Sequence, residues 1–188
     1  MTLPFYNSFF QTTTVPAVQL AARLAALAPK VGDHGFEHVF YSSSGSESND
    51  SNVRMVRRYW DLQGQPQRKV IISRFNAYHG STIAGASLGG MSSMHAQGDL
   101  PIPDIVHIEQ PYFFEKGLPG ESREEFGLRA AGWLEEKILA LGPERVAAFI
   151  AEPVQGAGGV IIPPDSYWPE IQRIVDKYGI LLISDEVI

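Results

Sequence analysis

Apolar residues recur along the chain in two alternating patterns, short continuous runs and longer stripes at helical spacing. The continuous runs cover residues 38–41, 70–73, 105–108, 146–151 and 180–183. A continuous run predicts a strand with both faces covered, whereas a strand with one exposed face would alternate apolar and polar residues. We therefore expect five strands, most of them buried within a sheet.

Five stripes at helical spacing lie between or beside these runs. They predict helices over residues 16–28, from the turn at 42–46 to Gly64, over 81–88, from Ser122 to Gly142, and over 167–178. In the second of these helices the stripe consists of Asn49, Val53, Val56 and Trp60. Ser122 and Glu125 have the spacing of a capping box, which marks a helix start. Residues 89–104 lack a clear period and are expected to form a loop. Strands that alternate with helices predict an α/β fold, with a mostly parallel sheet, helices on both faces and right-handed crossovers.

Composition narrows the class of protein. The 188 residues are 44% hydrophobic, which predicts a packed core rather than a disordered chain. The formal net charge is −6 and the basic residues are scattered, so we expect no nucleic-acid partner. The longest apolar stretch, residues 179–183, is far shorter than the roughly 20 residues of a membrane-spanning helix. We expect no membrane segment.

The residue types also limit the chemistry. The chain has no cysteine, which excludes thiolate nucleophiles, disulfides and cysteine-based zinc sites. Its five histidines show no HExxH-type pairing, so no metal is expected. The amino end lacks the basic start and apolar centre of a signal peptide, and together with the absence of cysteine this predicts a cytoplasmic protein.

Unusual polar segments follow three of the predicted strands. In open α/β sheets, ligands bind outside the carboxyl ends of the strands. The turn at residues 44–46 (SGS) leads into a helix, whose free amide groups could hold a phosphate. Glu152 follows one buried strand and Asp185 another. An ionised Asp185 after such an apolar run needs a partner, and a buried cation is one solution.

Each of these features also has an ordinary structural explanation. Ser-Gly-Ser before a helix is a common amino-terminal cap. Glu152 and Asp185 could cap helices or bind loop amides. Tyr78, near the end of another strand, could be a half-buried loop aromatic. Taken together, however, a phosphate cradle, an aromatic side chain and a carboxylate fit a phosphorylated, planar, nitrogen-containing ring. No P-loop and no GxGxxG fingerprint is present.

Four segments, in this order and at these intervals, resemble a known family. They are residues 44–50 (SGSESND), 77–80 (AYHG), 152–156 (EPVQG) and 185–187 (DEV). They resemble the class III aminotransferases, which are pyridoxal-phosphate enzymes of fold type I, and the resemblance runs through essentially the whole chain. Residues 6–11 (YNSFFQ) are similar to the amine:pyruvate branch, the ω-transaminases.

The resemblance implies roles for the residues around the cofactor, pyridoxal 5'-phosphate. Gly45 and Ser46 would hold its phosphate, and Ser44 would shape the turn. Tyr78 would stack on the pyridine ring, with His79 in support.

The remaining roles come from the two later motifs. Asp185, the catalytic residue that we assign, would pair with the ring nitrogen. Val187 would pack on the opposite ring face from Tyr78, and Glu152 would hydrogen-bond around the cofactor or Asp185. Ser48 replaces the family's alanine, a small change near the phosphate turn.

The chain ends directly after a predicted strand, which is expected of a fragment. Residues 1–188 would form part of a pyridoxal-phosphate-binding large domain, without the small domain and the region of the Schiff-base lysine. The five lysines, at positions 30, 69, 116, 137 and 177, do not lie in that motif context. We expect residues 1–188 alone to be inactive.

The resemblance implies that the intact enzyme transfers an amino group from an amine donor to an oxo acid such as pyruvate, and that it is a homodimer. Two alternatives stay open. An aminomutase or a decarboxylase would share the same motifs, and the fragment could also be a catalytically inactive cofactor-binding module.

Overall fold

The structure is a computed structural model that describes residues 13–31 and 34–188. The chain divides into two compact units, Met1–Ser42 and Ser43–Ile188, which are described separately. Residues 6–11, whose sequence resembles the amine:pyruvate branch, lie outside the described residues.

The first unit contains one helix and a short hairpin. Its elements are α1 (Val15–Leu27), β1 (Lys30–Val31) and β2 (His34–Gly35), and the two strands pair antiparallel. The helix predicted over residues 16–28 is confirmed, and the Thr14 hydroxyl caps it by accepting from the Ala17 amide at 3.4 Å. Leu20 and Leu24 of its apolar stripe remain 48% and 42% exposed.

The strand predicted at residues 38–41 is wrong. These residues form no regular element, and Phe40 and Tyr41 are 66% and 46% exposed. The Tyr41 hydroxyl donates to the Ala17 carbonyl at 2.8 Å. Aromatic and β-branched residues favour strands only where a neighbouring strand packs beside them, and none does so here in the described structure. The turn at residues 44–46 therefore follows an irregular segment.

A four-stranded parallel sheet forms the centre of the second unit. Its strands, in spatial order, are β4 (Ile105–Ile108), β3 (Val70–Arg74), β5 (Val146–Ala151) and β6 (Leu181–Ser184). The predicted α/β class is confirmed. Every residue of β3 and β5 is buried, as their continuous apolar runs predict.

The prediction that both faces are covered fails for β6. This strand lies at the edge of the sheet, and its side chains alternate between partly buried and exposed. Leu181 and Ile183 pack on the core, whereas Leu182, on the opposite face, is 37% exposed.

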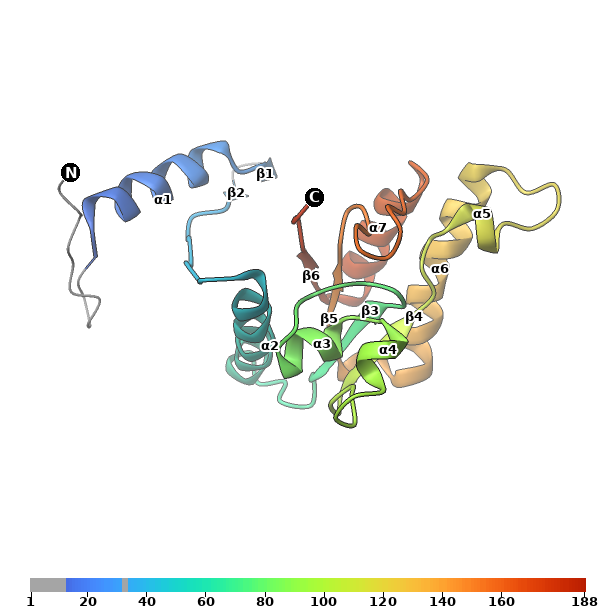
Figure 1. Ribbon diagram of the computed structural model, residues 1–188, viewed down its shortest axis with the longest axis horizontal. Helices are drawn as coiled ribbons and strands as arrows, with labels where there is room; N and C mark the ends of the chain where they lie inside the picture. The colour runs from blue at the N-terminus through green and yellow to red at the C-terminus, as the bar shows by residue number, and fades with distance from the viewer. Residues whose placement is uncertain (1–12, 32–33) are drawn as a thin grey trace. The chain divides into compact units, whose positions relative to one another are not determined.

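Helices cover the two faces of the sheet (Figure 1). On one face, α2 (Gly45–Leu62) and α3 (Ile83–Leu88) pack with Ile71 and Ile150. On the other face, α6 (Arg123–Leu141) and α7 (Tyr167–Tyr178) pack with Ile72 and Phe149. Successive strand residues thus point into two separate cores, which is the reason that these strands carry no alternation.

The long helices match their predictions closely. The buried residues of α2 are the four of its predicted stripe, Asn49, Val53, Val56 and Trp60. At the start of α6, Ser122 and Glu125 form the predicted capping box. Besides the β1–β2 hairpin, three short helices were not predicted: α4 (Ser92–His95), α5 (Phe113–Lys116) and the 3-10 helix η1 (Pro143–Arg145). One turn is too short to show a period, so α4 lies within the segment expected to be a loop.

Across the described residues, no helix has the length and apolar character needed to cross a membrane.

Candidate functional site

A cavity of about 430 Å³ opens at the carboxyl ends of β3, β5 and β6. Its wall is built from the start of α2, the turn after β3, the loop after β5 and the segment after β6. The lining residues are Gly45, Ser46, Asn49, Tyr78, His79, Gly80, Glu152, Gly156, Ala157, Asp185, Val187 and Ile188. Seven of the eight predicted site residues therefore line one cavity, and Ser44 does not.

Ser44 acts as the cap of α2. Its hydroxyl accepts from the Glu47 amide at 3.2 Å, and the Glu47 carboxylate accepts from the Ser43 amide at 2.8 Å. The ordinary capping explanation thus applies to Ser44, which shapes the turn while Gly45 and Ser46 line the cavity. Amides of the first helical turn have no acceptor within the helix, and they lie at the positive end of its dipole.

There is open space beside the start of α2. A Cβ added at Gly45 would meet no atom within 4 Å. By contrast, Gly80 faces Ser46 so closely that an added Cβ would lie 2.6 Å from its Oγ, and Gly80 has a φ of +125°. The Ser81 amide donates to the same Oγ at 3.1 Å. The turn after β3 is therefore packed tightly against the start of α2.

Tyr78 lines the cavity on this same turn. It is 40% exposed, and its hydroxyl lies 2.9 Å from the Ser81 Oγ. One face of the cavity is thus aromatic, and Ser81 connects Tyr78 with Ser46.

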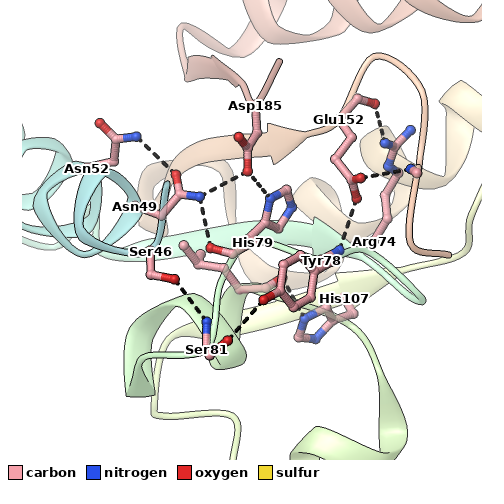
Figure 2. A network of polar contacts seen from close by, with 12 residues as sticks. Ser46, Asn49, Asn52, Arg74, Tyr78, His79, Ser81, His107, Glu152 and Asp185 are labelled. Atoms are coloured by element: carbon pink, nitrogen blue, oxygen red, sulfur yellow. Dashed lines mark hydrogen bonds and ion pairs between the residues drawn. The ribbon is translucent and has the colours of Figure 1, made fainter. Parts of the chain in front are cut away.

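Asp185 is held by two neighbours that arrive from other elements (Figure 2). Asn49 Nδ2 donates to its Oδ2 at 2.9 Å, and His79 Nδ1 lies 2.7 Å from the same oxygen. Burial raises the pKa of Asp185, but the hydrogen bonds from His79 and Asn49 and the charge of His79 together lower that pKa overall. An ionised carboxylate only accepts, so His79 Nδ1 carries the proton of this pair.

Glu152 has a different role in the structure from that of Asp185. Its carboxylate accepts from the amides of Tyr78 and Gly156, each at 3.0 Å, and no hydrogen bond joins it to Asp185 among the described residues. These contacts match the alternative in which Glu152 binds loop amides. Its backbone carbonyl accepts from the Arg74 guanidinium. Glu152 thus ties the loop after β5 to the turn that carries Tyr78.

Val187 lines the cavity, although 79% of it is exposed. It follows Asp185 by two residues, so both side chains belong to the segment after β6.

Sequence reasoning missed two residues of this network, Asn49 and Arg74. Asn49 is 3% exposed and contacts both Asp185 and the His79 carbonyl. Its signal was present, because it is the one polar residue on the apolar stripe predicted for that helix. Arg74 is fully buried at the end of β3, with its Cζ 5.7 Å from the Trp168 ring. Nothing in the sequence marks it, since its contacts come from distant segments.

The arrangement suits a ligand that is anionic at one end and cationic at the other. Helix amides with open space beside them would bind the anionic end, and the ionised Asp185 would bind the cationic end. Tyr78 supplies an aromatic face between the two.

Comparison with known proteins finds similar sequences over nearly the whole chain. The family model described as "Aminotransferase class-III" matches residues 4–188. A putrescine–pyruvate aminotransferase from Pseudomonas aeruginosa is 61% identical over 187 residues, which are 99% of this chain and 40% of that protein. The probable gamma-aminobutyrate transaminase 2, mitochondrial, of Oryza sativa subsp. indica is 50% identical over 99% of this chain and 37% of its own length.

The fold is shared with solved transaminases. The crystal structure of the omega transaminase from Pseudomonas jessenii in complex with PMP matches with a TM-score of 0.92 and 47% identity, over 98% of this chain and 40% of that one. The chain thus spans about 40% of the length of the P. aeruginosa relative and of this solved structure.

Proposed function

The chain belongs to the class III aminotransferase family, as the order and spacing of its motifs predicted, and from this we propose that its protein transfers an amino group from an amine donor to an oxo acid such as pyruvate. The single observation that supports this most strongly is the cavity in which Gly45, Ser46, Tyr78 and Asp185 meet.

The family's cofactor, pyridoxal 5'-phosphate, fits the residues of this cavity. The open space beside Gly45 leaves room for a phosphate at the start of α2, where the Gly45 and Ser46 amides would hold it. Tyr78 would cover one face of the ring and Val187 the other. Asp185 would bind the ring nitrogen through its negative charge. When bound, the cofactor supplies an electron-withdrawing ring that carries the amino group between the two substrates.

The chain's own residues would prepare this site before substrate arrives. Asn49 and His79 keep the Asp185 carboxylate ionised, so that it stabilises a positive charge on the ring nitrogen. Glu152 fixes the backbone of Tyr78, so that the aromatic ring stays in place. Such preorganised contacts require no rearrangement during the reaction.

We propose further that residues 1–188 form part of the cofactor-binding large domain. No lysine is among the described residues that line the cavity. In this proposal the lysine that reacts with the cofactor, and the small domain, belong to other parts of the protein.

The test is amino transfer by the full-length protein. With putrescine, the donor named for the P. aeruginosa relative, and pyruvate, we expect alanine to form in step with loss of the amine. A protein that forms no alanine from pyruvate, and instead releases carbon dioxide from an amino acid or moves the amino group within one substrate, would be a decarboxylase or an aminomutase and would contradict the proposal.

We also propose that the intact enzyme is a homodimer located in the cytoplasm. Both statements rest on the family resemblance and on the sequence. Light scattering of the purified protein tests the first, and cell fractionation tests the second.

A further inference from the structure

Asn49 is a buried amide on an otherwise apolar helix face. It is 3% exposed, and its stripe companions Val53, Val56 and Trp60 pack on the sheet. Burying an amide is costly unless its polar atoms are paired. Both ends of this amide are paired: Nδ2 donates to two acceptors, and Oδ1 accepts from Asn52 Nδ2 at 3.2 Å.

The surroundings of Asn49 require a donor. Its Nδ2 lies 2.9 Å from Asp185 Oδ2 and 3.0 Å from the His79 carbonyl oxygen. An ionised carboxylate and a carbonyl can only accept, so the amide nitrogen must face them. One side chain of α2 therefore holds both the segment after β6 and the turn after β3.

The two hydrogen bonds on Asp185 converge on a single oxygen. Asn49 and His79 both contact Oδ2, and Figure 2 shows both dashed lines meeting there. Within the described residues, Oδ1 has no hydrogen bond, and the Asp185 side chain lines the cavity. The protein thus occupies one carboxylate oxygen and leaves the other for a ligand.

We propose that Asn49 is a positioning residue that holds the Asp185 carboxylate ionised, with Oδ1 left for the cofactor's ring nitrogen, and so sets the pH range in which the cofactor binds. This inference rests on the proposed function, because it presumes that the cavity binds pyridoxal phosphate. Asn49 would act through Asp185 and would not itself touch the reacting atoms.

The pH dependence follows from the groups around Asp185. His79, from the turn after β3, contacts Asp185 directly. Tyr78 and Glu152 line the same cavity. Glu186 is the next residue in the chain, and its carboxylate accepts a hydrogen bond from the Ser184 hydroxyl. On α2, Asn49 is the contact, and it is neutral. Burial raises the Asp185 pKa and the two hydrogen bonds lower it. Without Asn49 the pKa of Asp185 rises, so Asp185 takes up a proton at a higher pH than in the wild type. The affinity for a cationic ring is then also lost at a higher pH.

The experiment measures binding of pyridoxamine 5'-phosphate to the full-length protein between pH 3.5 and 8, a range that extends below pH 5 because the pKa of Asp185 lies below its ordinary value of 3.8. This amine form makes no covalent bond with a lysine, so its Kd reports the non-covalent contacts alone. Asn49→Leu keeps the approximate size and suits the apolar stripe but removes the donor. Asn49→Ala removes it with a smaller side chain. Gln63→Leu is the matched control, since it replaces an exposed amide at the end of the same helix.

We expect both Asn49 variants to bind about tenfold to a hundredfold more weakly at pH 7, the range for a lost hydrogen bond to a charged group. In both, the loss of affinity on acidification should begin at a higher pH than in the wild type. Gln63→Leu should leave the Kd and its pH profile unchanged.

Three results would overturn the proposal. The first is an unchanged Kd in the Asn49 variants. The second is a Kd that is raised equally at every pH, so that the acid side of the pH profile does not move. The third is failure of both Asn49 variants to fold, which would make Asn49 a core residue only. If the wild-type protein itself does not bind pyridoxamine phosphate, the proposed function fails. If the wild type and the variants bind it equally well, only the role of Asn49 fails.

Discussion

In the proposed function, the chemistry of the cavity depends most on the negative charge of Asp185. Two donors, Asn49 and His79, hold it from different elements, and together they outweigh the effect of burial on its pKa. A carboxylate in such a position is an electrostatic partner already in place for a cation.

Replacing Asp185 by Asn in the full-length enzyme should therefore separate charge from shape. The new amide oxygen would accept from Asn49 and His79, which leaves an N–H facing the cavity in place of the anionic oxygen. We expect turnover per cofactor-loaded site to fall on the order of 10²-fold or more. Asp185→Glu should also be damaging, because the longer side chain misplaces the charge.

The measurement is the transamination rate divided by the occupied cofactor sites. A rate within a few-fold of wild type for Asp185→Asn, the scale of ordinary surface substitutions, would show that the charge does not serve catalysis.

Tyr78 should contribute to cofactor retention through its ring. Tyr78→Ala should weaken binding of pyridoxamine phosphate by about 0.5–1.5 kcal/mol beyond the effect of lost contact area. Tyr78→Phe keeps the ring and loses only the contact with the Ser81 hydroxyl, so its effect should be smaller. Cofactor loss during dialysis measures both variants. If the wild type and Tyr78→Ala lose cofactor equally fast, the ring does not contact it.

Single residues differed in how far they could be predicted. Asp185 and Tyr78 follow strands, and the rule that ligands bind at the carboxyl ends of parallel strands made them candidates, both of which line the cavity. Asn49 lies 136 positions from Asp185, and Arg74 is 78 positions from Glu152. Pairings over such separations depend on the order of the strands, which the pattern of apolar residues does not specify.

The start of α2 and the turn after β3 form one unit through Ser46 and Gly80. An added Cβ at Gly80 would lie within 2.9 Å of three atoms of Ser46, and its φ of +125° is unfavourable for other residues. Gly80→Ala should lower the free energy of unfolding by about 1–3 kcal/mol from backbone strain, and should also weaken pyridoxamine phosphate binding by displacing Ser46.

Gly64→Ala provides the control, since Gly64 also has a positive φ, +71°, but an added Cβ there meets no atom within 4 Å. Chemical denaturation of both variants measures the effect of backbone strain on stability. Cofactor titration of both variants measures the effect of displacing Ser46 on binding. Equal cofactor affinity in Gly80→Ala and Gly64→Ala would contradict the role of this contact.

Elements with a strong period were predictable, and those that depend on neighbours were not. The buried face of α2 and the cap of α6 follow from local sequence alone. Residues 38–41 have the composition of a strand but lack a pairing partner among the described residues. The half-exposed face of β6 depends on its place at the sheet edge, which its own four residues do not reveal.

The chain as a whole carries a cavity without a lysine among its described lining residues. We therefore expect residues 1–188, produced alone and supplied with pyridoxal phosphate, an amine and pyruvate, to form no alanine. Chromatographic detection of alanine tests this expectation, with the full-length enzyme as the positive control. Reproducible conversion that disappears when one of the five lysines is replaced would show that the chain contains its own reactive lysine.

In the proposed function, this cavity binds the cofactor of a class III aminotransferase in one defined orientation. The most direct test is a crystal structure of the full-length protein with pyridoxamine 5'-phosphate. We expect the phosphate at the Gly45 and Ser46 amides, the ring beside Tyr78, and the ring nitrogen about 2.7–2.9 Å from Asp185 Oδ1, with Asn49 and His79 still on Oδ2. A phosphate bound away from the start of α2, or a ring nitrogen that does not contact Asp185, would contradict it.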